Sequence, residues 1–377
     1  MTRSRRMAGG PSPARHLEEE QMRTWHGTTQ RWSWAAMVAA FVVVAACGPA
    51  APSAPADTSP ASAEPTAVAA TATPELETLE IAYLSFAIAN SYDAPMLAAA
   101  QAAAAAGNAN LTVFDANNDP GAQTQQLQDA VASGRYDGII VQPIFGAGLV
   151  TGVEAAIAAG VKVGNLDQVL GEDMTTSAGQ VEGLSANVVF IPSEIGRKLG
   201  ELTIQACGAI DPCEVGYIYA FKGFALDNAI KAAFDAAIGG TASVKVVAEG
   251  EGFFSAPGGL AAGQDMLQAQ PGLSVIVGSD QAITGAIQAA DGAGVKANIK
   301  FIGYGGGAIA IQGVASGERF ATVVQLPATE GRLVVEHLIQ AIRTGNAVPG
   351  VDPVAELPDD GIVTQDNASS FTAEWPG

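Results

Sequence analysis

The sequence is poor in the residues that most often carry metal or covalent chemistry. Among its 377 residues there are only three histidines and three cysteines. Two of the histidines, His16 and His26, precede an apolar run near the N-terminus, so the rest of the chain has His337 alone. A lone histidine on an expected helix is more simply a packed or solvated residue than a ligand or a general base. These scarcities argue against a zinc site and against a Ser-His-Asp or Cys-His hydrolase.

Positive charge is also scarce. The formal net charge is −20, and after Cys47 only twelve Lys and Arg stand against thirty-five Asp and Glu. A body this acidic repels nucleic acid and anionic membrane surfaces. Aromatic residues make up only 6% of the chain, and no basic patch interleaved with them is present. We therefore expect no nucleic-acid partner and no membrane contact through the folded body.

The N-terminal region indicates export. The apolar run at 34–47 is shorter than the roughly 20 residues that span a membrane, but it suits the core of a signal peptide. Its last residues, Val44-Ala45-Ala46-Cys47, resemble the lipobox of bacterial lipoproteins, which implies that Cys47 receives the lipid. We expect a signal peptide over 1–46. Met22 is an alternative start, because three consecutive glutamates at 18–20 are unusual in a basic leader.

Residues 47–78 are dominated by Pro, Ala, Ser and Thr without an apolar period. Such a composition buries too little apolar surface to offset the entropy of ordering, so we expect a flexible linker behind the lipid anchor. The location is then the cell envelope, outside the cytoplasmic membrane. In that oxidising compartment the two remaining cysteines, Cys207 and Cys213, are expected to form a local disulfide.

From residue 79 onward, short apolar runs alternate with alanine-rich stretches, which is typical of repeated β-α units and a parallel sheet. No short fixed repeat is visible, so a solenoid is not expected. Two α/β halves of about 100 to 130 residues fit better than one large sheet. We expect strands at 79–84, 111–114, 138–142, 161–167, 214–219, 244–249, 274–278, 300–304 and 321–325. We expect helices at 94–106, 122–133, 227–238, 260–269, 283–290 and 308–315.

Ligands of open parallel sheets bind at the carboxyl ends of the strands. The residues expected there combine aromatic rings with short carboxyl, amide and hydroxyl groups, which suit a small neutral polyhydroxylated ligand. Any one of them could instead cap a helix or satisfy a turn, so only the set carries weight. The set is Ser85, Phe86, Asp115, Gln142, Asp167, Gln168, Phe221, Lys222, Phe253, Phe254, Ser279, Asp280, Tyr304 and Gln325.

Over roughly 79–368 the chain resembles the type 1 periplasmic solute-binding proteins of ABC transporters, the ribose- and galactose-binding kind. The stretch "LSFAIANSYDAPM" is similar to the family's first strand and loop, which places Ser85, Asn90 and Tyr92 by the ligand. The stretch "DANNDPGAQTQQLQDAVASGRYDGIIVQP" ends with Gln142 at a polar position of the family, and Asp167 matches an aspartate that grips sugar hydroxyls. "ATVVQLPATEG" resembles the segment in which a glutamine, here Gln325, reaches the ligand.

The resemblance implies two Rossmann-like lobes joined by three crossing strands that close around a solute and dock on a membrane permease. The crossings are expected near 185–187, with Ser185 at the ligand, near Gln325, and within 348–363. The lobes are then 79–185 with 326–350, and 186–325 with 351–377. The resemblance therefore implies a monomeric solute-binding lipoprotein of an ABC importer. We expect no catalytic residue, cofactor or metal. A sensor that presents its ligand to a chemoreceptor or kinase remains an alternative.

Departures from the family leave the solute open. Gln168 and Ile230 stand where sugar binders commonly have arginine, and the second-lobe Asn-Asp pair is Ser279-Asp280 here. The Gly-Phe-Asp turn is Gly-Tyr-Gly at 303–305, so the amides of Gly305 and Gly306 are expected to supply contacts. Lys222 is either a replacement donor or a surface lysine. A sugar or polyol is favoured over nucleosides and amino acids.

The glycine cluster at 303–307 raises a different hypothesis, a dinucleotide-dependent enzyme. The spacing is not a convincing GxGxxG, and no acidic residue follows about 20 positions later at the end of a strand. A DNA-binding repressor would need a basic helix-turn-helix before the first lobe, where this chain has the expected signal and linker. Both alternatives are therefore disfavoured.

Overall fold

The computed structural model describes residues 76–377. The expected signal peptide, the alternative start at Met22, the lipidated Cys47 and nearly all of the linker lie outside the described residues. Within residues 76–377, no helix combines the length and the apolar character needed to cross a membrane.

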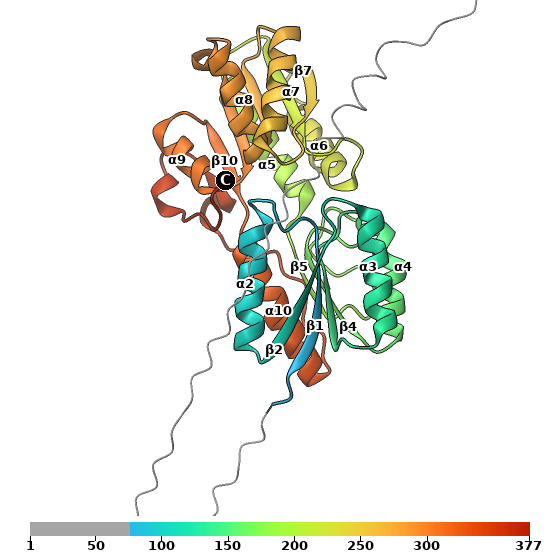
Figure 1. Cartoon of the computed structure of the whole chain (residues 1–377). Helices are drawn as coiled ribbons and strands as arrows, with labels where there is room; N and C mark the ends of the chain where they lie inside the picture. Colours follow the sequence, from blue (N-terminus) through green and yellow to red (C-terminus); the bar gives the residue numbers. More distant parts are fainter. Residues whose placement is uncertain (1–75) are drawn as a thin grey trace, which may run out of the picture. The chain divides into compact units, whose positions relative to one another are not determined.

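The first lobe contains a five-stranded parallel sheet in the order β2-β1-β3-β4-β5. Helices α2 and α10 cover one face, and helices α3 and α4 cover the other (Figure 1). The strands are β1 (Leu79–Ser85), β2 (Ala109–Asp115), β3 (Gly138–Val141), β4 (Lys162–Asp167) and β5 (Ala186–Val189). The helices are α2 (Asp93–Ala106), α3 (Pro120–Ser133), α4 (Gly146–Ala158) and α10 (Pro327–Thr344).

The second lobe contains a six-stranded sheet in the order β11-β10-β9-β8-β6-β7, in which only β11 runs antiparallel to its neighbour. Its strands are β6 (Cys213–Tyr219), β7 (Val244–Glu251), β8 (Val275–Ser279), β9 (Lys300–Gly305), β10 (Ala321–Val324) and β11 (Ile362–Val363). Its helices are α5 (Pro192–Cys207), α6 (Ala225–Ile238), α7 (Ala256–Ala269), α8 (Asp280–Gly292) and α9 (Ala308–Ser316), with short 3-10 turns η2 (Lys296–Asn298), η3 (Pro358–Gly361) and η4 (Ala368–Ser370).

The fold class expected from the sequence, two α/β lobes with parallel sheets, is confirmed by this topology. Central strands β3 and β8 are buried along their whole length, because helices cover both faces of each sheet. Two helices begin where a side chain accepts hydrogen bonds from the free backbone amides of the first turn. The Asp119 carboxylate accepts from the amides of Gly121 and Ala122 at the start of α3, and the Ser279 hydroxyl caps α8.

The chain passes three times between the sheets. Strand β5 leads into α5, and β10 leads into α10, which packs in the apolar core of the first lobe. In the third passage Val351 pairs with Val188 of the first sheet before β11 joins the second. Strand β5 pairs with β4, so residues 186–189 belong to the first sheet rather than to the second lobe. The remaining lobe boundaries stay a prediction.

Cys207 and Cys213 form a disulfide with a Cα–Cα distance of 5.7 Å. The bridge joins the end of α5 to the first residue of β6, where both cysteines are buried. It therefore closes the loop between a helix and the strand that follows it in the chain.

A buried ion pair organises the second lobe beneath the carboxyl ends of its strands. Asp280 Oδ1 lies 2.8 Å from Arg319 Nη1, and both side chains are almost fully buried. Asp280 Oδ2 accepts hydrogen bonds from the Gly306 amide at 2.7 Å and the Thr322 hydroxyl at 2.8 Å. A Cβ at Gly303 would collide with this carboxylate, so the position needs glycine. Asp280 is thus fully engaged by protein groups.

Replacing Arg319 with leucine should lower the free energy of unfolding by about 3 to 5 kcal/mol, because it leaves the Asp280 carboxylate buried without its counter-charge. Arg332→Leu is the matched control, since Arg332 pairs with Glu336 on the exposed face of a helix. Its cost should stay below about 1 kcal/mol. Urea unfolding of both variants checks the difference, and equal costs would contradict it.

Candidate functional site

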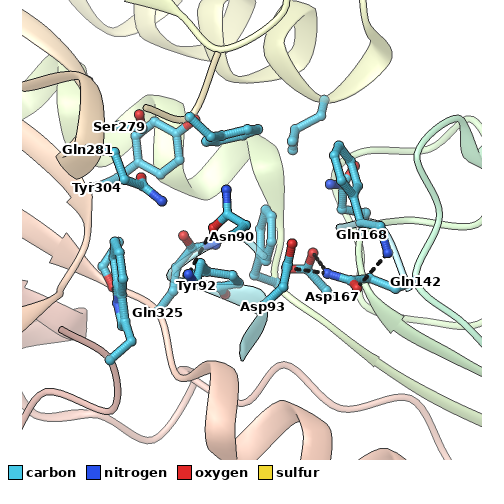
Figure 2. Close-up of a pocket in the computed structure, with 16 residues that line it drawn as sticks. Asn90, Tyr92, Asp93, Gln142, Asp167, Gln168, Ser279, Gln281, Tyr304 and Gln325 are labelled. Carbon is cyan, nitrogen blue, oxygen red and sulfur yellow. Dashed lines mark hydrogen bonds between the residues drawn. The ribbon is translucent and has the colours of Figure 1, made fainter. Parts of the chain in front are cut away.

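One cavity opens where the carboxyl ends of the two sheets meet, enclosing about 500 Å³ of space not filled by protein atoms, part of it open to solvent. Residues of both lobes line it (Figure 2). The lining residues are Phe86, Asn90, Tyr92, Asp93, Gln142, Asp167, Gln168, Phe190, Leu226, Phe254, Ser279, Gln281, Tyr304, Gly305, Gln325 and Trp375.

A hydrogen-bond network centred on Gln142 forms the first-lobe side of the cavity. Its amide nitrogen donates to Asp93 Oδ1 at 2.7 Å and to Asp167 Oδ2 at 3.2 Å, while its amide oxygen accepts from the Phe86 amide at 3.0 Å (Figure 2). The side-chain amide of Gln123 donates to the backbone carbonyl of Gln142 at 2.7 Å. The two carboxylates are therefore held by one amide whose own position is fixed.

Burial shifts the ionisation of these acids. It raises the pKa of Asp93 to about 8, and the neighbouring Asp167 charge adds to that shift. Burial likewise raises the pKa of Asp167 and of Glu330, and the Asp167 charge adds to the shift at Glu330. Glu330, on α10, accepts a hydrogen bond from the Tyr92 hydroxyl at 3.3 Å. Three acids therefore share one desolvated region.

Positive charge is missing from this region: the residues that line the cavity include two aspartates but no lysine, arginine or histidine. Asp167 Oδ1 and Glu330 Oε1 are buried and have no hydrogen-bond partner. Asp167 lies in the left-handed region at φ 68°, directly at the end of β4. An unpartnered carboxylate oxygen on a cavity wall is an acceptor available to a bound molecule.

Aromatic rings form much of the remaining wall. Six of them line the cavity, namely Phe86, Tyr92, Phe190, Phe254, Tyr304 and Trp375. The Trp375 indole donates to the Gly305 carbonyl at 2.8 Å, and its ring meets the Tyr92 ring edge to face at 5.4 Å. Its backbone carbonyl accepts from the Ala308 amide, which fixes the end of the chain against α9. Ring faces of this kind pack against the CH surfaces of a small solute.

Seventeen side chains are candidates from the sequence: the fourteen strand-end residues, together with Asn90, Tyr92 and Ser185. Ten of them line the cavity: Phe86, Asn90, Tyr92, Gln142, Asp167, Gln168, Phe254, Ser279, Tyr304 and Gln325. Their contact with a ligand stays a prediction. In Figure 2, Ser279, Gln281 and Tyr304 lie across the cavity from Asp93 and Asp167. Both lobes thus present amide and hydroxyl groups, but the acids that line the cavity come from the first lobe alone.

The other seven candidates do not line the cavity: Ser85, Asp115, Ser185, Phe221, Lys222, Phe253 and Asp280. Ser85 is buried with its hydroxyl 3.5 Å from Gln142 Oε1, and Ser185 lies at the crossing, where its carbonyl accepts from the Val348 amide. Phe221 stacks on Phe224 at 5.2 Å and packs with apolar residues of the first lobe. Both carboxylate oxygens of Asp280 are bonded to protein groups, among them Arg319 in the ion pair described above.

The expected roles of the glycine amides at 305–306 and of Lys222 can now be compared with the structure. The Gly306 amide is not free for a ligand, because it donates to Asp280. Gly305 gives room to Trp375, whose ring a Cβ there would overlap. Lys222 is exposed and pairs with Glu249 at 2.7 Å, so it is a surface lysine rather than a cavity donor.

Five lining residues were missed from the sequence: Asp93, Phe190, Leu226, Gln281 and Trp375, whereas Gly305 had been expected through its amide. Asp93 is the first residue of α2, and an acid at a helix N-terminus is explained by its interaction with the helix dipole. It therefore gave no reason to expect a binding residue. Phe190 follows β5, which is too short to stand out as an apolar run. Trp375 lies beyond the last β-α unit, so strand-end logic could not locate it.

The fold and the cavity define a two-lobed solute-binding protein. The family model described as "Periplasmic binding protein domain" matches residues 81–347, so the chain belongs to the periplasmic binding protein family. This confirms the family resemblance seen in the sequence.

Curated relatives agree with this assignment. The chain is 27% identical over 259 residues to the D-allose-binding periplasmic protein of Escherichia coli (strain K12), covering 68% of this chain and 82% of that protein. It is 26% identical over 230 residues to the ribose import binding protein RbsB of Bacillus subtilis (strain 168), covering 59% and 68%. Both relatives are named as binding proteins rather than enzymes.

Solved structures share the fold. An ABC transporter solute-binding protein from Mycobacterium smegmatis with bound glycerol gives a TM-score of 0.67 at 24% identity, covering 80% of this chain and 100% of that one. The Caulobacter myo-inositol binding protein gives 0.68 at 21% identity, covering 80% and 98%. At these identities the likeness supports the architecture alone.

The stability of the ligand-free protein should fall as pH rises from about 4 to about 8, because folded Asp93 keeps its proton after the unfolded aspartate has lost it. Asp93→Asn removes this titration and should flatten the fall by about 1 kcal/mol or more. Urea unfolding across this pH range measures both slopes. Identical slopes for the variant and the wild type would contradict the raised pKa.

Proposed function

We propose that this chain is an extracytoplasmic solute-binding lipoprotein that captures a small sugar or polyol between its two lobes and delivers it to an ABC import permease. The observation that carries the proposal is the cavity itself, which combines six aromatic rings with amide, hydroxyl and carboxyl groups at the ends of strands from both sheets. Rings stack on CH faces, while short polar groups accept and donate to hydroxyls. The relatives named for allose and ribose support this class of solute.

Capture by lobe closure has support in the contacts at the rim of the cavity. Phe86, Ala116 and Ile144 of the first lobe pack with Phe221 and Phe224 of the second. A molecule that binds both walls at once favours the conformation in which these rims meet. A few kcal/mol of differential binding is enough to shift such an equilibrium. This is the state that a permease would recognise.

A thermal-shift panel tests the solute class. The purified protein is heated with pentoses, hexoses, myo-inositol, nucleosides and amino acids, each near its saturating concentration. A ligand at about 100 times its dissociation constant should add roughly 2.7 kcal/mol of stability. If only nucleosides or amino acids raise the melting temperature, the sugar or polyol assignment fails.

Asp167→Ala should abolish the stabilisation by the best ligand of that panel, because it removes the carboxylate with a free oxygen on the cavity wall. Asp129→Ala is the matched control, since Asp129 is exposed on α3 and bonds only Gln125 among side chains. Calorimetric titration of both variants measures the affinity. Full affinity in Asp167→Ala would remove that residue from the site.

The lipid anchor is tested separately. In cells, Cys47→Ser should move the protein from the membrane fraction to the soluble fraction, because the residue that the lipobox-like segment marks for acylation is gone. Mass spectrometry of the wild-type membrane fraction should find the lipid on Cys47. An unmodified Cys47 in membrane-bound protein would contradict the anchor without affecting the solute assignment.

A further inference from the structure

The charges around the cavity do not balance. Asp93 and Asp167 line it and Glu330 adjoins it through Tyr92, yet no lining residue is cationic. The nearby cations are engaged elsewhere, with Arg319 paired to Asp280 and Lys222 to Glu249. Carboxylates removed from water without a counter-charge are costly, so a proton or a bound cation must balance them.

We propose, building on the proposed sugar-binding function, that the natural solute carries a protonated amino group, as an amino sugar or aminocyclitol does, and that this group binds Asp167 and Asp93. The acceptor is already in place. Gln142 occupies Asp93 Oδ1 and Asp167 Oδ2, while Asp167 Oδ1 is buried without a hydrogen-bond donor and the Glu330 carboxyl lies within hydrogen-bonding reach of Asp167. An ammonium group supplies the donors that this oxygen lacks. The expectation of a neutral solute is thereby revised.

The rest of the wall distinguishes this cation from others. Residues 76–377 contain no group of three or more His, Cys, Asp or Glu side chains arranged to hold a metal ion. Aromatic rings such as Phe86, Tyr92 and Trp375 line the same cavity, and ring faces attract ammonium ions. An organic cation therefore suits this wall better than a metal.

The opposite wall argues for hydroxyl groups on the same molecule. Ser279, Gln281 and Gln325 present hydroxyl and amide groups that suit sugar hydroxyls. An amino acid would instead bring a carboxylate into a cavity that lacks a lysine, arginine or histidine. Sugar acids and sugar phosphates are disfavoured for the same reason.

Protonation gives a second signature. Burial raises the pKa values of Asp93, Asp167 and Glu330, so part of this cluster holds protons in the free protein near neutral pH. The phenols of Tyr83, Tyr92 and Tyr304 also face it, and burial keeps them protonated. Three further acids act on the cluster: Asp115 on Asp93, and Glu374 and Asp352 on Glu330. A bound ammonium stabilises the ionised acids, so its binding should release protons.

The test uses the full purified chain and matched probes: glucosamine with glucose and N-acetylglucosamine, and galactosamine with galactose and N-acetylgalactosamine. Isothermal titration in two buffers of different ionisation enthalpy measures affinity and proton release together. At least one amino sugar should bind about tenfold or more tighter than both its neutral partners and should release protons. Asp167→Asn should remove most of that preference, whereas Asp129→Asn should keep it.

Two results overturn the inference and are distinguishable. If a neutral sugar binds as tightly as its amino counterpart, or more tightly, the ammonium site is wrong while the sugar-binding function stands. If no probe of either kind binds, and the wider sugar and polyol panel also fails, both proposals fall.

Discussion

The side-chain amide of Gln142 is the contact on which the binding wall of the first lobe depends. It joins Asp93 at the start of α2, Asp167 at the end of β4 and the Phe86 amide after β1. One group therefore holds both ends of the β1–α2 loop to the distant end of β4. Because its oxygen accepts from the Phe86 amide while its nitrogen donates to both aspartates, the amide has little freedom to turn. A wall built this way is preorganised, so binding costs less ordering entropy.

Asp280 and Asp167 show how differently one residue type can be used at the ends of strands. Both are buried and both follow or end a strand, but Asp280 has an arginine, a hydroxyl and a glycine amide as partners. Asp167 has amide, hydroxyl and carboxyl neighbours but no cation, and one of its oxygens has no hydrogen-bond donor. The first arrangement stabilises a loop, and the second leaves an acceptor for a solute. Counter-charge, rather than burial, separates the two roles.

These two aspartates also mark the limit of prediction from sequence. Strand ends were predictable because buried parallel strands are continuous apolar runs, and the residues that follow them converge on one edge. That logic located Gln142, Asp167, Tyr304 and Gln325 on the cavity wall. It could not show that Asp280, and not Asp167, forms an ion pair, because its partner Arg319 lies 39 positions away in the sequence.

Trp375 was beyond prediction for a different reason: it belongs to no strand or helix, and only its tertiary contacts place it. Glu374 beside it accepts hydrogen bonds from the amide and hydroxyl of Thr329 at the start of α10. The indole bonds Gly305 of the second sheet, and its ring touches Tyr92 of the first lobe. The end of the chain thus contacts both sides of the cavity. Any rotation of the lobes that opens the cavity must break the ring contact or the indole bond, which couples this aromatic wall to closure.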